Sequence, residues 1–188
     1  MREESKKITK VINTCLDCFI AKGLTATTTK DLCDALGVCN GAIYYYFKTK
    51  EEIVLACAEE SINRIEQKTF TFVLENLKDI ADTMNRLSEL ADELSPVMRF
   101  FVSVSVSDEY GEKVKPYLVK LSERYSCYAE KIADILGCTV ADVEPYVYLS
   151  ILAINNYMIF NERALFQPQL ESAKRGLFKL INNETPKG

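Results

Sequence analysis

The sequence predicts an all-α protein, with a three-helix helix-turn-helix head followed by a helical-bundle body. Apolar residues recur at steps of three and four along most of the chain, which is the period of helices that bury one face. Glycine and proline are scarce, at seven and five of 188 residues, and most of them fall between these periodic segments. Near the start, two short helical segments joined by a glycine-containing turn follow a longer one, which is the helix-turn-helix order.

The head is predicted to contain three helical segments. The first covers residues 4–22 and has one apolar face. The second begins at Thr28, a favourable N-cap residue, carries Asp31 in its first turn and ends at Gly37. The third covers residues 40–47, where Asn40 could serve as the N-cap.

This third segment contains three consecutive tyrosines, Tyr44 to Tyr46, between Ile43 and Phe47. Successive side chains on a helix point about 100° apart, so four consecutive aromatic residues surround the cylinder. Ile43 and Phe47, four residues apart, are predicted to be buried against the other head helices. The tyrosines then face water or a partner, unless they are half-buried residues of an amphipathic helix.

The body is predicted to be helical throughout. A long helix begins near Lys50 and extends to about Lys68, and an amphipathic stripe follows over residues 77–91. Residues 114–135 form a further stripe, whereas residues 146–160 carry no charge and are apolar on every side. The last helix presents one apolar face with Leu170, Ala173, Leu177 and Leu180.

One segment of the body has a different pattern. Residues 100–107, FFVSVSVS, alternate apolar and polar with a period of two, which is typical of a strand. The chain offers no second strand-like segment, and an isolated strand leaves its backbone groups unpaired. We therefore predict that this segment is helical.

Composition restricts the class of function. The chain is 48% hydrophobic and 27% charged, which is an ordinary globular composition. No apolar run reaches the roughly 20 residues of a membrane span, and the first ten residues lack a signal peptide's apolar stretch, so we expect a cytoplasmic protein without a membrane partner. Histidine is absent, which excludes His-dependent catalysis and His-ligated metals, and there is no glycine-rich phosphate loop. We expect no enzyme activity, no metal and no cofactor.

The seven cysteines are an odd number without the spacing of a disulfide framework, which favours reduced thiols. Cys15 and Cys18 form a C-x-x-C pair that could bind zinc or exchange disulfides. No second pair follows at zinc-finger spacing, and both residues lie on an apolar helix face, so a place in the core is favoured. Cys127 and Cys138 in the body leave a thiol sensor open, although buried thiols are usually inert.

Charge is unevenly distributed between the two parts. Residues 1–50 hold eight Lys or Arg and five Asp or Glu, whereas residues 51–188 hold 15 basic and 22 acidic residues. A basic head on an acidic body is compatible with nucleic-acid contact through the head alone.

The stretch TTTKDLCDALGVCNGAIYYYFKTKEEI resembles the DNA-binding head of the tetracycline-repressor (TetR) family of bacterial transcription regulators. The resemblance covers about residues 8–55, and the body resembles the family only in being helical. Cys39 stands where the family usually has a capping Ser, and Ala42 stands where Thr or Ser is common. The positions that match the family pattern are Thr28, Leu32, Gly37, Val38, Gly41, Ile43, Tyr44, Phe47, Lys50 and Glu51.

The resemblance implies a ligand-responsive transcription regulator, usually a repressor, that binds a palindromic double-stranded operator as a homodimer. Residues 1–49 would be the DNA-binding domain and residues 50–188 the ligand-binding and dimerisation domain. A helical sensor or interaction protein without DNA binding stays open, because of the departures at Cys39 and Ala42.

Residue chemistry suggests how the head would contact DNA. A tyrosine hydroxyl can donate to a phosphate, and its ring can pack on a sugar or a thymine methyl. Gly41 would let the backbone approach the duplex closely, and Thr28 and Lys50 lie at helix starts, which attract phosphates. The predicted DNA-binding residues are Thr28, Asn40, Gly41, Ala42, Tyr44, Tyr45, Tyr46 and Lys50.

Two further sites are predicted in the body. Aromatic walls with a few polar groups suit an apolar or weakly polar effector, and the predicted ligand-binding residues are Phe100, Tyr125, Tyr128 and Asn155. The alternative is that these tyrosines reach the surface and the asparagine serves the backbone. The uncharged segment 146–160 needs cover on a second face, which predicts dimerisation through the last two helices. The predicted interface residues are Tyr157, Leu170, Ala173, Leu177 and Leu180.

Overall fold

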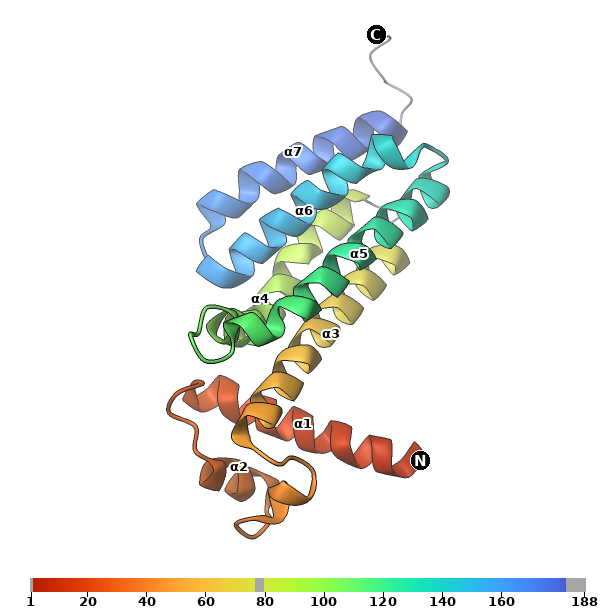
Figure 1. Cartoon of the computed structure of the whole chain (residues 1–188). Coiled ribbons are helices and arrows are strands. Elements are labelled where there is room, and N and C mark those ends of the chain that lie inside the picture. Colours follow the sequence, from red (N-terminus) through yellow and green to blue (C-terminus); the bar gives the residue numbers. More distant parts are fainter. Residues whose placement is uncertain (1, 77–79, 182–188) are drawn as a thin grey trace. The chain divides into compact units, whose positions relative to one another are not determined.

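A computed structural model of the chain describes residues 2–76 and 80–181, and in these residues it contains α-helices and one 3₁₀ turn but no strand (Figure 1). The all-α prediction is confirmed. The elements are α1 (Arg2–Lys22), α2 (Thr29–Leu36), η1 (Ala42–Tyr45), α3 (Lys50–Asn76), α4 (Ile80–Ser105), α5 (Gly111–Leu136), α6 (Val140–Phe160) and α7 (Arg163–Ile181). No helix in the described ranges is both long and apolar enough to cross a membrane.

Side-chain caps explain where α2 and α6 begin. The Thr28 side chain accepts a hydrogen bond from the backbone N–H of Asp31, whose carboxylate accepts one from the backbone N–H of Thr28. Thr139 and Asp142 form the same capping box at α6. Gly37 ends α2 in the left-handed conformation, with φ of 67°, so both predicted ends of this helix are confirmed.

Two predicted elements differ from the structure in length. The segment 40–47 is not a helix throughout, because only Ala42–Tyr45 form a single 3₁₀ turn. Helix α3 does not end near Lys68 but continues to Asn76, since Phe70 and Val73 pack on other helices in its last turns. Leu77, the first residue of the predicted stripe 77–91, lies outside the described residues.

The segment FFVSVSVS is helical, as predicted, and belongs to α4 as far as Ser105. The hydroxyl of Ser103 donates to the carbonyl of Phe100 at 2.7 Å, and that of Ser105 donates to the carbonyl of Phe101 at 2.8 Å. These bonds to the preceding turn satisfy the serine hydroxyls within the helix itself. The alternating pattern therefore does not require a strand.

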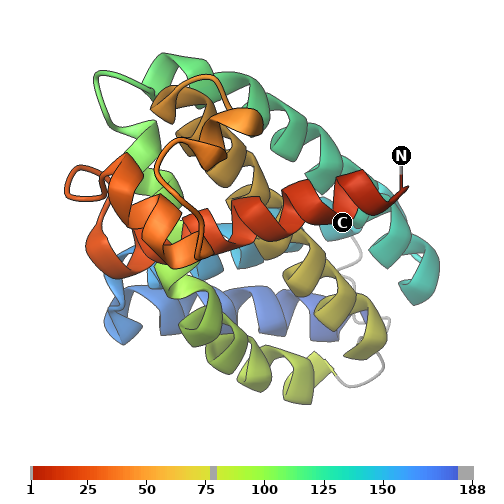
Figure 2. The same cartoon turned by 90° about the horizontal axis from the view of Figure 1, so that it is seen from below.

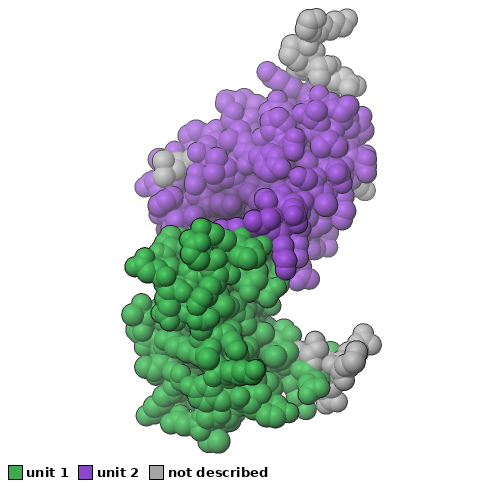
Figure 3. All heavy atoms as spheres, viewed as in Figure 1, with its two compact units in different colours: residues 1–65, 96–117 green, residues 66–95, 118–188 purple. Residues whose placement is uncertain are grey.

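The chain divides into two compact units (Figure 3). Unit 1 comprises residues 1–65 and 96–117, and unit 2 comprises residues 66–95 and 118–188. In unit 1, α1 and α2 pack against each other (Figure 2), and Phe19 of α1 stacks on Phe100 of α4 with ring centroids 5.5 Å apart. Unit 1 therefore contains the whole head together with the end of α4 and the start of α5.

The C-x-x-C cysteines belong to the core of unit 1. Cys15 is fully buried and Cys18 nearly so, and Cys33 and Cys57 are buried in the same unit. Burial is the main cause that raises the pKa of the Cys15 thiol to about 12, so the thiolate that a metal or an oxidant needs is disfavoured there. The core interpretation of the C-x-x-C pair agrees with this environment.

One core cluster of unit 2 is formed by apolar side chains of α5 and α6. It comprises Ala129, Ile132, Ala133, Val143 and Val147, and Val73 and Leu180 pack against it. Helices α6 and α7 lie side by side in both views (Figures 1 and 2). Gly176 of α7 faces the ring of Tyr146, because a Cβ at this glycine would meet a ring carbon at 1.9 Å. The absence of a side chain at Gly176 thus permits the close contact of the two helices.

Candidate functional site

The turn that carries the three tyrosines has one buried side and one exposed side. Ile43 is 1% exposed and Phe47 is 7% exposed, as their spacing predicts. Tyr44, Tyr45 and Tyr46 are 49%, 80% and 37% exposed, so none of them is a core residue. The rings of Tyr45 and Tyr46 meet edge to face with centroids 5.1 Å apart. The turn therefore presents a small aromatic surface to the solvent.

Gly41 sets the backbone at the start of this turn. Its φ of 98° is a left-handed conformation that glycine adopts without the strain of other residues. Within the described residues, no side chain caps η1, so Asn40 does not take the capping role expected for it. A Cβ at Gly41 would meet no described atom within 4 Å. Glycine is thus required at position 41 for its backbone conformation and not to make room for a neighbouring atom.

The start of α2 has a balanced charge. Asp31 accepts a hydrogen bond from the Thr28 hydroxyl at 2.6 Å and from the Lys22 ammonium at 2.5 Å. These bonds hold the pKa of the Asp31 carboxyl well below its usual range, and the bond from Lys22 has the largest effect. Because Lys22 offsets the carboxylate, the helix start does not repel an anion such as a phosphate. The Thr28 hydroxyl is engaged by Asp31 and would have to change partner to reach DNA.

Lys50 is the first residue of α3, and the acids that follow it are engaged elsewhere. Glu51 pairs with Lys113 of α5 at 2.5 Å, and the Glu52 carboxylate accepts the backbone N–H of Lys48 at 2.7 Å. The Thr49 hydroxyl accepts the backbone N–H of Glu52 at 3.2 Å and so caps the helix. The ammonium of Lys50 therefore adds positive charge at a helix start that already favours anions.

The structure divides the four predicted ligand-binding residues between the units. Tyr125, Tyr128 and Asn155 belong to unit 2, where the Tyr125 hydroxyl is hydrogen-bonded to the Asn155 side chain and the rings of Tyr125 and Tyr128 lie 6.3 Å apart. Phe100 belongs to unit 1, where its ring stacks on Phe19. Three of the four residues thus form one cluster.

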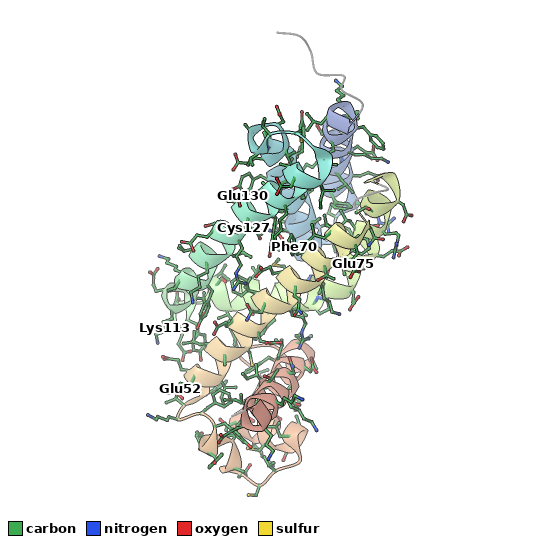
Figure 4. All side chains as sticks on the ribbon, turned by 90° about the vertical axis from the view of Figure 1, so that its right-hand side faces the viewer. Glu52, Phe70, Glu75, Lys113, Cys127 and Glu130 are labelled. Atoms are coloured by element: carbon green, nitrogen blue, oxygen red, sulfur yellow. The ribbon has the colours of Figure 1, made fainter. Side chains whose placement is uncertain are left out.

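Residues that the sequence reasoning missed complete this cluster. The hydroxyl of Tyr128 donates to one carboxylate oxygen of Glu66, and the guanidinium of Arg124 donates to the other. Phe70 of α3 stacks on Tyr128 with ring centroids 3.7 Å apart, and Figure 4 shows Phe70 on the side of α3 that faces α5. Burial and the bond to Glu66 raise the pKa of Tyr128, so this phenol stays protonated and remains a donor. The spacing of Glu66, Phe70 and Val73 on one helix face was the available signal.

The predicted interface residues are covered within the chain itself. Tyr157, Leu170, Ala173 and Leu177 are each at most 7% exposed, and Leu180 packs on the core cluster of unit 2. The Tyr157 hydroxyl donates to Asp92 at 2.6 Å, and its ring lies 4.8 Å from that of Phe166. Among the described side chains, the large apolar ones that α6 and α7 leave exposed are different ones, namely Val140, Tyr148, Leu152, Phe160 and Phe178.

Comparison with known proteins gives a family match in the head. Residues 11–57 match the model of bacterial regulatory proteins, tetR family. The uncharacterized HTH-type transcriptional regulator YfiR of Bacillus subtilis is 25% identical over 190 residues, which cover 91% of this chain and 90% of that protein. The HTH-type transcriptional regulator TtgR of Pseudomonas putida is 29% identical over 97 residues, covering 51% and 39% respectively. The HTH-type transcriptional repressor KstR2 of Rhodococcus jostii is 35% identical over 51 residues, covering 27% and 25%.

Proposed function

We propose that this chain, which belongs to the tetR family of bacterial regulatory proteins, is a ligand-responsive repressor that binds a palindromic operator as a homodimer. It is a helix-turn-helix transcription regulator and not an enzyme. The proposal assigns DNA binding to residues 1–49 and effector binding and dimerisation to residues 50–188. The observation that carries it is the exposed tyrosine turn, anchored by Ile43 and Phe47.

Exposed tyrosines have a use on a DNA-binding surface. About half to two-thirds of the hydrogen bonds that proteins make to DNA go to phosphate and sugar, and a phenol can make such bonds while its ring packs on the backbone or a thymine methyl. Tyr45 is 80% exposed, so its ring and its hydroxyl are both accessible to a partner surface. We assign the DNA contacts to Asn40, Gly41, Ala42 and the three tyrosines, with Thr28 and Lys50 on phosphates.

Dimerisation follows from the geometry of the operator. Two recognition segments must lie about 34–36 Å apart to enter successive major grooves, so a single head reads only half of a palindromic site. We propose that α6 and α7 form the interface and that their outward side chains meet the second copy. Tyr148, Leu152 and Phe160 are 39%, 52% and 63% exposed, whereas Leu170, Ala173 and Leu177 act inside the chain and support this surface.

An effector would act through the separation of the two heads. A ligand that binds better to a dimer with another head separation weakens operator binding by the ratio of its affinities for the two states. We place the effector at the cluster of Tyr125, Tyr128 and Asn155 in unit 2.

The test is operator binding by head variants, starting from a gel shift with the DNA that flanks the protein's own gene. Tyr44→Phe and Lys50→Ala should each weaken binding to a similar degree on all sequences, because each removes a phosphate contact. Lys50→Ala should also reduce the salt slope of log K by about 1. Lys120→Ala, an exposed lysine of α5, is the control and should change neither quantity. Unchanged affinity in both head variants would contradict the assigned surface.

Asn40→Ala should behave differently from these two variants. Asn40 is exposed and does not cap the turn, so its amide is available for a base edge. We expect the variant to lose discrimination at one base pair by about 1–3 kcal/mol, with little change in nonspecific binding. Competition between operators substituted at single positions measures this, and an evenly distributed loss would instead place Asn40 on a phosphate.

A further inference from the structure

The exposed hydrophobic side chains of unit 1 gather in the turn that follows α2. Among the described residues of this unit, five large hydrophobic side chains are exposed, and four of them lie within residues 38–46, namely Val38, Tyr44, Tyr45 and Tyr46. The fifth, Val106, lies in the segment between α4 and α5. The outer side of the turn therefore offers apolar groups to a partner.

Asn40 adds one amide to this apolar surface. The backbone N–H of Ala42 donates to the carbonyl of Cys39 at 3.0 Å, so Asn40 and Gly41 form the tip of the chain between them. Asn40 is exposed, and its amide makes no hydrogen bond to another residue in the described part of the chain. Both the donor and the acceptor of this side chain are therefore available to a partner.

The turn lacks the residue types that read G·C base pairs. Guanine is usually read by Arg or Lys at O6 and N7, and the amino group of cytosine by Asp or Glu. Residues 35–47 contain none of these four types. Lys48 is the next charged residue, but it follows the buried Phe47, and its backbone N–H donates to the Glu52 carboxylate at 2.7 Å. Lys48 therefore belongs to the start of α3 and not to the turn.

We propose that the turn selects A·T base pairs, with Asn40 bonded to an adenine and with Val38 and Tyr45 packed on thymine methyl groups. The amide oxygen of Asn40 accepts from N6 of the adenine, and its N–H donates to N7. The methyl group of thymine is the apolar group that base pairs present in the major groove, so it matches the exposed hydrophobic side chains. This proposal rests on the proposed DNA binding and adds the base composition of the half-site.

The experiment selects binding sites for the full chain from DNA duplexes with a random central sequence. We expect the selected half-sites to be defined mainly by A·T pairs. Replacing single thymines of a selected site by deoxyuridine removes only the methyl group, and at the contacted positions it should weaken binding about fourfold, the effect of burying one such group. Half-sites defined by G·C pairs, or equal binding of all thymine and uracil duplexes, would overturn the proposal.

Val38→Ala and Tyr45→Ala assign the methyl contacts to side chains. Each variant should bring the ratio of thymine to uracil affinity close to one at its own position and keep it at the others. Val106→Ala removes an exposed hydrophobic side chain of the same unit outside the turn, so it is the matched control and should keep every ratio. Ratios that survive in both turn variants, or that fall equally in the control, would overturn the assignment.

Two further measurements test Asn40 and Lys48. Replacing single adenines by 7-deazaadenine removes the N7 acceptor, which should weaken the native chain several-fold at one position and leave Asn40→Ala unaffected there. Equal losses in both proteins would contradict the adenine contact. Lys48→Ala should keep the base preference, whereas a preference lost in this variant would assign base reading to Lys48 instead.

The selection also separates this proposal from the proposed function. A chain that selects half-sites defined by G·C pairs keeps its role as a DNA-binding regulator and loses the base preference proposed here. A chain that enriches no sequence at all overturns both proposals.

Discussion

The tyrosines of η1 owe their exposure to the two side chains that anchor the turn. Ile43 and Phe47 are buried, whereas the three tyrosines between them are exposed. Gly41 contributes in another way, because its backbone conformation directs the chain into the turn. Single residues thus determine the shape of this turn, and they do so through burial and φ rather than through a side-chain cap.

Gly41→Ala tests the backbone role at this scale. The variant should lose about 1–2 kcal/mol in the free energy of unfolding, because a Cβ is strained in the left-handed region. Gly41→Asn should lose less, since asparagine tolerates this conformation better. No described atom lies within 4 Å of the added Cβ, so a steric clash contributes nothing. Urea unfolding should give free energies of unfolding that decrease from the native glycine to asparagine to alanine. An alanine variant as stable as the native chain would exclude backbone strain at this position.

Residue-level features were predictable where they depend on near neighbours in the sequence. The Thr28–Asp31 capping box and the burial of Ile43 and Phe47 are separated by three and four residues, so helical geometry alone indicates them. The pairing of Glu66 with Arg124 spans 58 residues and depends on how α3 packs on α5. The periodicity of the sequence does not predict that packing.

At the scale of elements, caps and close packing define the helices. α2 and α6 start with the same Thr and Asp pair, three residues apart. α6 and α7 pack closely because Gly176 leaves room for the ring of Tyr146. An apolar stripe was predicted for α7, but a stripe does not tell whether its own chain or a second copy covers it. Leu170, Ala173 and Leu177 proved to be covered by their own chain.

The capping box of α2 should make the stability of the head depend on pH. Thr28→Ala should cost about 1 kcal/mol at neutral pH. The pKa of Asp31 is lowered below its ordinary value of 3.8 in the folded chain, so its contribution is present above that pH and lost as the pH falls further. The stability difference between the native chain and Asp31→Asn should therefore be constant above about pH 5 and shrink below about pH 4. The control is Asp34→Asn, because Asp34 is an exposed acid of the same helix. If Asp31→Asn and Asp34→Asn changed stability with the same pH dependence, the capping box would be excluded as the source of that dependence.

The α6–α7 contact allows a double-mutant cycle. Gly176→Ala should destabilise unit 2 by about 1–3 kcal/mol, because the new methyl group overlaps the Tyr146 ring and forces it to move. In a Tyr146→Ala background the same substitution should cost much less, since the obstructing ring is gone. Denaturant unfolding of the four proteins measures the coupling. Additive effects would show that Gly176 has another role.

At the scale of the whole molecule, the proposed function requires two copies. The exposed apolar residues of α6 and α7 offer a surface for the second copy, and the buried residues beneath them hold the two helices together. The helical period of the apolar residues predicted the all-α architecture, but the body sequence alone could not separate the inner from the outer face of α6. Residues 146–160 are apolar on every side, so periodicity gives no preferred face there.

Leu152→Arg should convert the proposed dimer into a monomer. Leu152 is 52% exposed in the single chain, so the charge is tolerated in the fold but not in an apolar interface. Val119→Arg on α5 is the matched control, because Val119 is 57% exposed and lies outside α6 and α7. Sedimentation velocity at micromolar concentration should show a monomer for the first variant and a dimer for the second. A native chain that sediments as a monomer would contradict the homodimer.

The start of η1 also bears on how such a protein changes its target over generations. No described side chain caps this turn, so the side chains at positions 39, 40 and 42 have no capping duty there. Cys39 and Asn40 are exposed, so substitutions there alter the outer surface without removing core contacts. If the turn contacts DNA as proposed, duplicated copies of the gene would acquire new operator preferences by single substitutions at these positions while keeping a stable head. The tolerance of this turn to substitutions at its exposed positions, rather than its present sequence, makes the head adaptable to new targets.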